Sequence, residues 1–210
     1  MISNKKELDF YIKADKMINR GYFVTPLKKR IIHIFHKDII IDFLTAMRCY
    51  SYYRHKEGVV NKILSWIYKL RFLNLSKKCN FTIGCDCFGY ALLLNHYGTI
   101  VIGSNNRIGN FASILTSTCI VQNGSNIGDF FFMGSGAVIS KSIRLGNNVK
   151  IGANSLVNKS FENNNILLAG SPAIVKKMTL KNWIEDYSIS DSNWQIRYNK
   201  IIELKKQMEL

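Results

Sequence analysis

The sequence predicts a mainly β fold, a parallel β-helix flanked by helical segments on both sides. The first observation is that apolar residues recur with a period of six, a pattern called the beat below. One extra residue interrupts the period between Ile120 and Ile127. The members are Ile102, Ile108, Ile114, Ile120, Ile127, Met133, Ile139, Leu145, Ile151 and Val157. The second is a glycine directly after many of them, at Gly103, Gly109, Gly128, Gly134, Gly146 and Gly152. A fixed short period is typical of a β-helix, because each hexad supplies one strand and one corner.

The beat also predicts which side chains point inward. No single coil can bury its apolar face, so stacked coils stabilise one another through these residues. A glycine beside each one lets the chain turn where a Cβ would crowd the corner. We therefore expect an interior column that contains Ile108, Ile114, Ile127, Met133, Ile139 and Ile151.

Residues 1–78 are predicted to form an α-helical domain. Apolar residues recur at helical spacing in two stretches, Ile39 to Met47 and Ile63 to Leu70. Gly21, Pro26 and Gly58 punctuate the region, which favours three or four helices of moderate length.

The β-helix domain is predicted over residues 79–175, with regular coils from Phe81 to about Val157. A polar loop at residues 162–165 and the turn segment Ala169–Ala173 follow. Residues 176–210 are expected to form one or two helices, whose apolar face contains Trp183, Trp194, Ile201 and Leu204.

The net charge of +15 is concentrated at the N-terminal end. Residues 1–80 hold 17 Lys and Arg against 6 Asp and Glu, a local charge of +11. The excess is either a surface for an acidic partner or an ordinary solvated face of the helices. Nucleic-acid binding is not expected, because the charge is diffuse and no recognised module is present.

The five cysteines indicate neither a disulfide framework nor a zinc knuckle, because their number is odd and no CxxC pair occurs. Cys119, inside a coil, is expected to pack as a small hydrophobe. The start of the chain lacks an apolar signal segment, and Ile31–Met47 is too short and too charged to cross a bilayer. Free thiols and these absences favour a cytoplasmic protein.

His96 is the candidate for chemistry. It is the only histidine in the repeat region, since the others are His33, His36 and His55. Histidine suits general-base work near neutral pH. A zinc site on the β-helix is not expected, because such a site needs three histidines and only His96 is available.

The beat, the segment His96–Ile102 and the exit Ala169–Ala173 resemble the hexapeptide-repeat acyltransferases. The resemblance covers most of the chain and is strongest to the serine acetyltransferase-like branch, which includes members from surface-polysaccharide clusters. It implies a left-handed coil, an exception to the usual right-handed crossover. It also implies a homotrimer with active sites in the clefts between chains.

The resemblance implies roles for individual residues. His96 would take the proton from an acceptor hydroxyl that attacks the thioester of acetyl-CoA. Asp86, the nearest upstream carboxylate, is one candidate to orient His96, although its spacing differs from that of the serine enzymes; Asp129 is the alternative. Asn95, beside the histidine, is counted with the catalytic candidates.

Binding of acetyl-CoA, by the same resemblance, would use coil corners and the exit turn, with no metal. The corner positions are Ser135 and Ala153, and the turn consists of Gly170, Ser171 and Pro172. Lys176 and Lys177 follow the turn, where they either meet the nucleotide phosphates or are simply solvated.

The acceptor is where the chain departs from the family. Serine acetyltransferases carry a long loop with a second histidine where this chain has only residues 121–125, and many polysaccharide-type relatives have a histidine where it has Leu115. We therefore expect O-acetylation of a sugar hydroxyl in capsule, O-antigen or other surface-polysaccharide biosynthesis. The acceptor would be a lipid-linked or acidic glycan, and the basic helical region could lie against such a glycan or against the inner surface of the membrane. Serine O-acetylation in cysteine biosynthesis and a non-catalytic trimeric glycan-binding scaffold are the alternatives.

Overall fold

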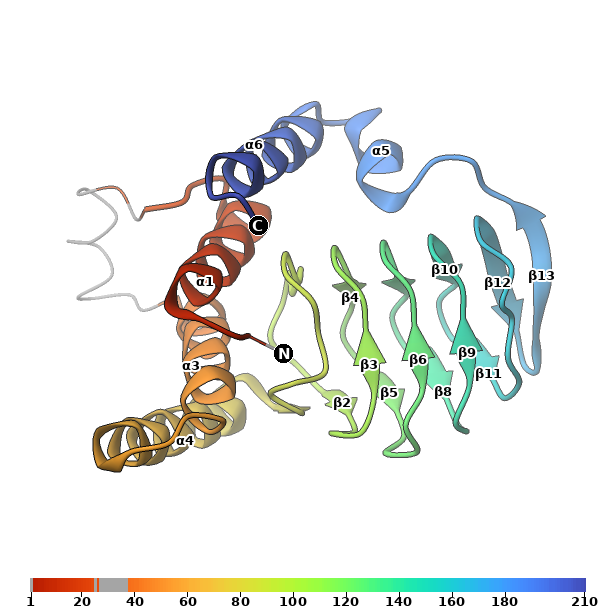
Figure 1. The fold of residues 1–210 in the computed structure, drawn as a ribbon. Coiled ribbons are helices and arrows are strands. Elements are labelled where there is room, and N and C mark those ends of the chain that lie inside the picture. The colour runs from red at the N-terminus through yellow and green to blue at the C-terminus, as the bar shows by residue number, and fades with distance from the viewer. Residues whose placement is uncertain (1, 25, 27–37) are drawn as a thin grey trace.

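The computed structural model describes residues 2–24, 26 and 38–210. Within the described residues, helices α1, α3 and α4 lead into a left-handed parallel β-helix of about five turns, and two C-terminal helices return towards α1 (Figure 1). The predicted fold class is confirmed.

The N-terminal region contains α1 (Lys5–Arg20), α3 (Ile39–Tyr53) and α4 (Val59–Cys79). The side chains of Asn4 and Asp38 cap α1 and α3, and each accepts a hydrogen bond from a backbone amide of the first turn. Residues 27–37, which include His33 and His36 and part of the predicted helical stretch, lie outside the described residues.

The strands of the β-helix form three sheets, which we call faces A, B and C. Face A contains β1 (Phe81–Ile83), β2 (Ile100–Ile102), β5 (Thr118–Ile120), β8 (Val138–Ile139) and β11 (Leu156–Val157). Face B contains β3 (Arg107–Ile108), β6 (Asn126–Ile127) and β9 (Arg144–Leu145). Face C contains β4 (Ser113–Ile114), β7 (Phe132–Met133), β10 (Val149–Ile151), β12 (Ile166–Gly170) and β13 (Ala173–Met178).

The predicted interior column is confirmed. Its six residues are no more than 4% exposed: Ile108, Ile114, Ile127, Met133, Ile139 and Ile151. Glycine is required where coils touch at a corner. A Cβ on Gly103 would lie 2.3 Å from the Cα of Gln122, and one on Gly109 would lie 2.8 Å from the amide nitrogen of Asp129.

The coil continues beyond Val157, where the regular beat was predicted to end. Phe161 bridges to Leu145 in the coil before it, and β12 pairs in parallel with β10. The polar residues 162–165 break the six-residue spacing without ending the coil. β13 then runs antiparallel to β12 through the turn at Gly170 and closes the sheet.

The C-terminal segment forms α5 (Trp183–Ser188) and α6 (Asn193–Gln207), as the apolar pattern predicts. The indole of Trp183 is buried and donates a hydrogen bond to the carbonyl oxygen of Phe111. Arg197 of α6 donates to the carbonyl oxygen of Ile18 in α1. The C-terminal helices therefore connect the β-helix to the first helix of the chain.

The outer surfaces of the three faces differ. On face C, Lys150 pairs with Asp186, and Phe132 packs against Tyr187, so α5 covers part of it. Face B presents exposed polar side chains: Arg107, Asn126 and Arg144. Face A presents a ladder of partly exposed apolar side chains in register: Val101, Cys119, Val138 and Leu156.

Cys119, predicted to pack as a small hydrophobe within a coil, is a free and partly buried thiol in the middle of β5. Side chains alternate along a strand, and its neighbours Thr118 and Ile120 take the inward positions. Cys119 consequently points to the outer surface of face A.

Candidate functional site

His96 lies at the corner where the first coil passes from face C to face A. It follows Leu93, which bridges to Ser113 on face C, and precedes β2 on face A. Its side chain is exposed, and the neighbouring Asn95 is partly exposed. The imidazole is therefore accessible to a ligand at this edge of the prism.

Helix α1 fixes the segment that leads to His96. The carboxylate of Asp15 accepts a hydrogen bond from the amide of Leu92 at 2.9 Å. The side chain of Asn19 accepts from the amide of Leu94 at 3.1 Å and donates to the carbonyl oxygen of Leu92. These bonds hold three consecutive buried residues in place just before the histidine.

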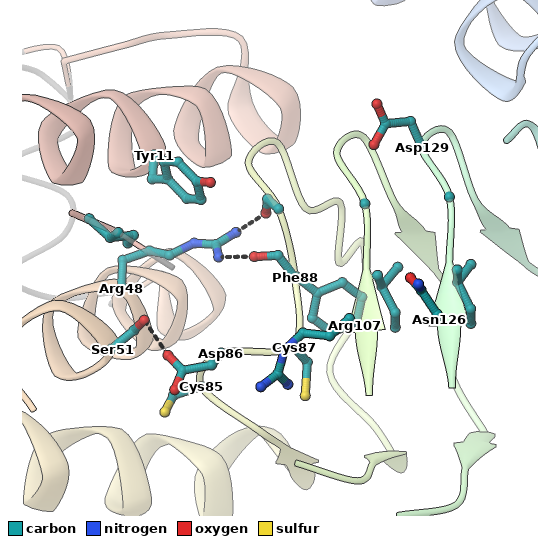
Figure 2. A pocket seen from close by; sticks show the side chains of 16 residues that line it. Tyr11, Arg48, Ser51, Cys85, Asp86, Cys87, Phe88, Arg107, Asn126 and Asp129 are labelled. Atoms are coloured by element: carbon teal, nitrogen blue, oxygen red, sulfur yellow. Dashed lines mark hydrogen bonds between the residues drawn. The ribbon is translucent and has the colours of Figure 1, made fainter. Parts of the chain in front are cut away.

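A buried ion pair strengthens that attachment. Arg48 of α3 binds Asp15 through two nitrogens, at 2.7 and 3.2 Å, and both side chains are 2% exposed. Arg48 also donates to the carbonyl oxygens of Phe88 and Gly89 (Figure 2). Burial raises the pKa of the Asp15 carboxyl, and the charge of Arg48 opposes that shift. Sequence reasoning missed this network, because the residue pattern within α1 or α3 does not indicate a partner on the other helix.

The predicted cofactor residues at the corners line up with His96. Successive coils stack at the C-to-A corner, where the amide of Ser117 donates to Thr99 and the amide of Asn154 donates to Ser135. Ser135 and Ala153 are exposed at this edge, one coil apart. Gly170, Ser171 and Pro172 form the exposed turn of the last coil at the same edge.

Lys176 and Lys177 lie on the closing strand of face C, away from the corner. Lys177 pairs with Leu167, three residues before Gly170. This offset places it about 10 Å along the strand from the turn. Both lysines are exposed.

The structure does not bring Asp86 together with His96. Asp86 lies between β1 and Phe88, at the corner from face A to face B. Its carboxylate accepts a hydrogen bond from Ser51 at 2.5 Å (Figure 2). It also contacts His55 Nε2 at 3.1 Å and Arg54 at 3.6 Å. Burial acts to raise the pKa of Asp86, but the hydrogen bonds from Ser51 and His55 and the charge of Arg54 together lower it.

The alternative acid is also engaged elsewhere. Asp129 Oδ1 accepts hydrogen bonds from the backbone amide of Asn110 at 2.7 Å and from its side chain at 3.2 Å. It is a corner residue that ties two coils together. Both carboxylates line a pocket of about 270 Å³ between the helices and face B, on a different edge from His96 (Figure 2).

The residues that the structure describes contain no group of three or more His, Cys, Asp or Glu side chains placed to hold a metal ion. None of the helices within residues 2–24 and 38–210 is both long and apolar enough to cross a bilayer.

The chain has the fold of the hexapeptide-repeat acyltransferases, as comparison with solved structures shows. The serine acetyltransferase from Brucella abortus strain S19 superposes with a TM-score of 0.54 at 22% identity, covering 83% of this chain and 68% of that chain. The serine acetyltransferase (CysE) of Neisseria gonorrhoeae gives 0.52 at 23% identity, covering 87% and 82%.

A third solved structure is a serine acetyltransferase in complex with CoA. It superposes with a TM-score of 0.52 at 20% identity, and the match covers 82% of this chain and 85% of that chain. No family model matches the sequence, and no curated protein matches it.

Proposed function

We propose that this protein is an acetyl-CoA-dependent O-acetyltransferase with His96 as its general base. The observation that carries the proposal is the edge that begins at His96 and continues through Ser135 and Ala153 to the turn at Gly170. It presents one exposed imidazole at one end and a row of small residues beyond it. Such an edge suits a long acyl carrier that delivers its reactive end to a base.

The proposed step is a single acyl transfer. The imidazole of His96 takes the proton from an acceptor hydroxyl as that oxygen attacks the thioester carbonyl. The carbon–sulfur bond breaks, and the departing thiolate receives the proton from the imidazolium. The products are an O-acetyl ester and CoA.

The dimensions of the edge fit an elongated co-substrate. His96 belongs to the first coil and Gly170 to the fifth, so four spacings of about 4.8 Å separate their corners by about 19 Å. Small side chains along this line leave backbone groups within reach of the amide-rich arm of acetyl-CoA. Lys176 and Lys177 would meet phosphates at the far end as point charges.

We propose a saccharide hydroxyl as the acceptor, in the assembly of a surface polysaccharide. The support is the tight corner at residues 121–125, which carries no extended loop. Asn106 fixes it by donating to the carbonyl oxygen of Val121 at 2.9 Å and accepting from the amide of Ser125 at 2.8 Å. This corner joins β5 of face A to β6 of face B, on a different edge from His96, so it would border the acceptor only where a second copy of the chain packs beside that edge. Without an extended loop it would leave room there for an acceptor bulkier than an amino acid.

We also propose that the protein is a homotrimer. The support is the apolar ladder on face A, which borders the edge that carries His96. Val101, Val138 and Leu156 are each partly exposed there. Burying such a ladder against a neighbouring chain would remove apolar surface from water and enclose the edge in a cleft.

Serine is the second candidate acceptor, and the solved serine acetyltransferases with this fold favour it. The test is acetyl-CoA turnover with a panel of L-serine, nucleotide sugars and oligosaccharides. We expect a saccharide to be the best acceptor. If L-serine leads the panel with a kcat/KM above about 10⁴ M⁻¹s⁻¹, the saccharide assignment is wrong.

The same panel separates both enzymes from a non-catalytic glycan-binding scaffold. A scaffold would bind glycans and release no CoA with any acceptor. CoA release that depends on an acceptor and on His96 excludes that reading.

A further inference from the structure

Helix α4 carries an apolar stripe on its outer surface. The stripe follows helical spacing of three and four residues, and its members are 45–75% exposed: Val59, Ile63, Trp66, Ile67, Leu70 and Leu73. Figure 1 shows α4 at the outer edge of the helical region, with its N-terminal end directed away from the β-helix. The stripe is therefore accessible along its length.

The inner side of α4 already accounts for its packing in the fold. Phe72 is 6% exposed and lies against Phe43 and Tyr50 of α3, with ring centroids 5.5 and 5.9 Å apart. Tyr68 stacks on Tyr53 at 5.5 Å. Helix α4 therefore packs on α3 through this inner side, and the outer stripe takes no part in that contact.

The charges around the stripe are all positive. Helix α4 contains no Asp or Glu, and it carries exposed cations at Lys62, Lys69, Arg71, Lys77 and Lys78. At 100° per residue, Lys62 and Lys69 lie along one side of the stripe and Lys78 along the other. Arg71 pairs with Asp42 of α3 at 3.3 Å.

We propose that α4 docks the protein on an anionic lipid surface. An apolar stripe bordered by lysines is the pattern of a helix that lies in the membrane interface, where its apolar side enters the acyl boundary and its cations meet lipid phosphates. Trp66, near the middle of the stripe, is the residue type that prefers this boundary. The proposal is independent of the transfer chemistry, and it would bring the edge with His96 close to a membrane-borne acceptor.

The charge also argues against a second copy of the chain as the occupant. Two α4 stripes placed face to face would bring ten cations and no α4 carboxylate into one interface. Like charges held together oppose association, whereas anionic lipid attracts the same cations.

Sedimentation with vesicles tests the proposal on the full chain, without acetyl-CoA or acceptor. We expect binding to phosphatidylcholine vesicles that contain 30% phosphatidylglycerol and little binding to phosphatidylcholine alone. A variant with Lys62, Lys69, Lys77 and Lys78 changed to Gln should bind at least about ten-fold more weakly. A matched control that removes four exposed lysines elsewhere (Lys5, Lys6, Lys200 and Lys206 to Gln) should keep most of the binding.

A second experiment tests whether the stripe enters the acyl-chain region of the bilayer. Lipids brominated on their acyl chains should quench tryptophan emission in the wild type and far less in Trp66→Phe. The two remaining tryptophans lie away from α4, because Trp183 is buried and Trp194 packs against Trp183 and Tyr187 in the C-terminal segment. The proposal is overturned if both charge variants bind alike or if the Trp66→Phe chain is quenched as strongly as the wild type. A double variant, Ile63→Ser with Leu70→Ser, gives a further test. The proposal is also overturned if this variant has a lower oligomer mass in ultracentrifugation and unchanged vesicle binding, because the stripe would then join copies of the chain.

Discussion

At the scale of single residues, His96 carries the proposed chemistry. His96→Asn should reduce turnover by about 10²- to 10⁴-fold, the usual contribution of a positioned general base. Binding of CoA should change little, because the cofactor contacts proposed here lie on other coils. Steady-state kinetics and calorimetric titration of CoA measure the two effects.

His55→Asn is the matched control, because His55 lies in the turn after α3 and contacts Asp86, which the structure does not bring together with His96. It should keep near-wild-type turnover. If instead His96→Asn keeps it, the histidine at the corner is structural.

Asp86 is expected to affect stability more than catalysis. Its pKa is lowered in the folded state, so its contribution is present above the ordinary value of 3.8 and is lost as the pH falls through the folded value. Asp86→Asn should cost about 1–2 kcal/mol at pH 7, because the hydrogen bonds to a charged acceptor weaken. Its thermal midpoint should then fall less than that of the wild type between pH 7 and pH 3.5. If Asp86→Asn instead loses as much turnover as His96→Asn, Asp86 takes part in catalysis.

At the scale of elements, the interior column predicts how a coil tolerates change. Ile114 is 1% exposed. Truncation of a buried isoleucine alone costs about 2–5 kcal/mol. Ile114→Asp should therefore destabilise by at least about 3 kcal/mol, since it also buries a polar group without a partner.

Ile63→Asp makes the same exchange on the outside of α4, where Ile63 is 52% exposed. It should stay within about 0.5 kcal/mol of the wild type. Urea denaturation measures the free energy of unfolding of both variants. An equal decrease in Ile63→Asp and Ile114→Asp would mean that the stripe on α4 is buried in the folded protein.

The coils were predictable from the sequence because their beat is local. Each inward residue lies six positions from the next, so Ile108 and Ile114 identify a strand and a corner without knowledge of the rest of the fold. The last coil was missed because the polar residues 162–165 alter this spacing. Helix α4 was predicted as a helix, but spacing alone does not tell whether Ile63 and Trp66 face inward or outward.

The site was predictable only in part, because a coil has three corners. Ten residues separate Asp86 from His96, and in a coil of about eighteen residues that separation leads to another corner. Ser135 and Ala153 share one edge with His96 because they occupy the same position in successive coils, and their role in binding the cofactor stays a prediction. The pairing of Asp15 with Arg48 joins two helices, and no pattern within either helix announces it.

At the scale of the whole molecule, the three faces predict how copies assemble. Val138 points outward from face A, within the apolar ladder. Val138→Glu would place a charge in the proposed interface and should convert the trimer to monomers. Analytical ultracentrifugation at several concentrations measures the mass.

Arg144→Glu on face B is the control, since its side chain is outward and exposed on a polar face. That variant should remain trimeric. A well-folded wild-type monomer, or a trimer that survives Val138→Glu, contradicts the assembly through face A.

The contact between α6 and α1 has a consequence for the order of folding. Coils of a β-helix can pack one after another as the ribosome releases them, because each touches mainly its neighbours. Helix α1 cannot complete its packing in this way, because its residue Ile18 binds Arg197, which is 179 residues away in the chain. The apolar cluster of α1 that includes Phe10 and Met17 is completed by Ile201, so α1 is synthesised long before its packing can be completed. Until α6 arrives, that cluster stays incomplete on the nascent chain, which makes it the place where a chaperone or premature association would act.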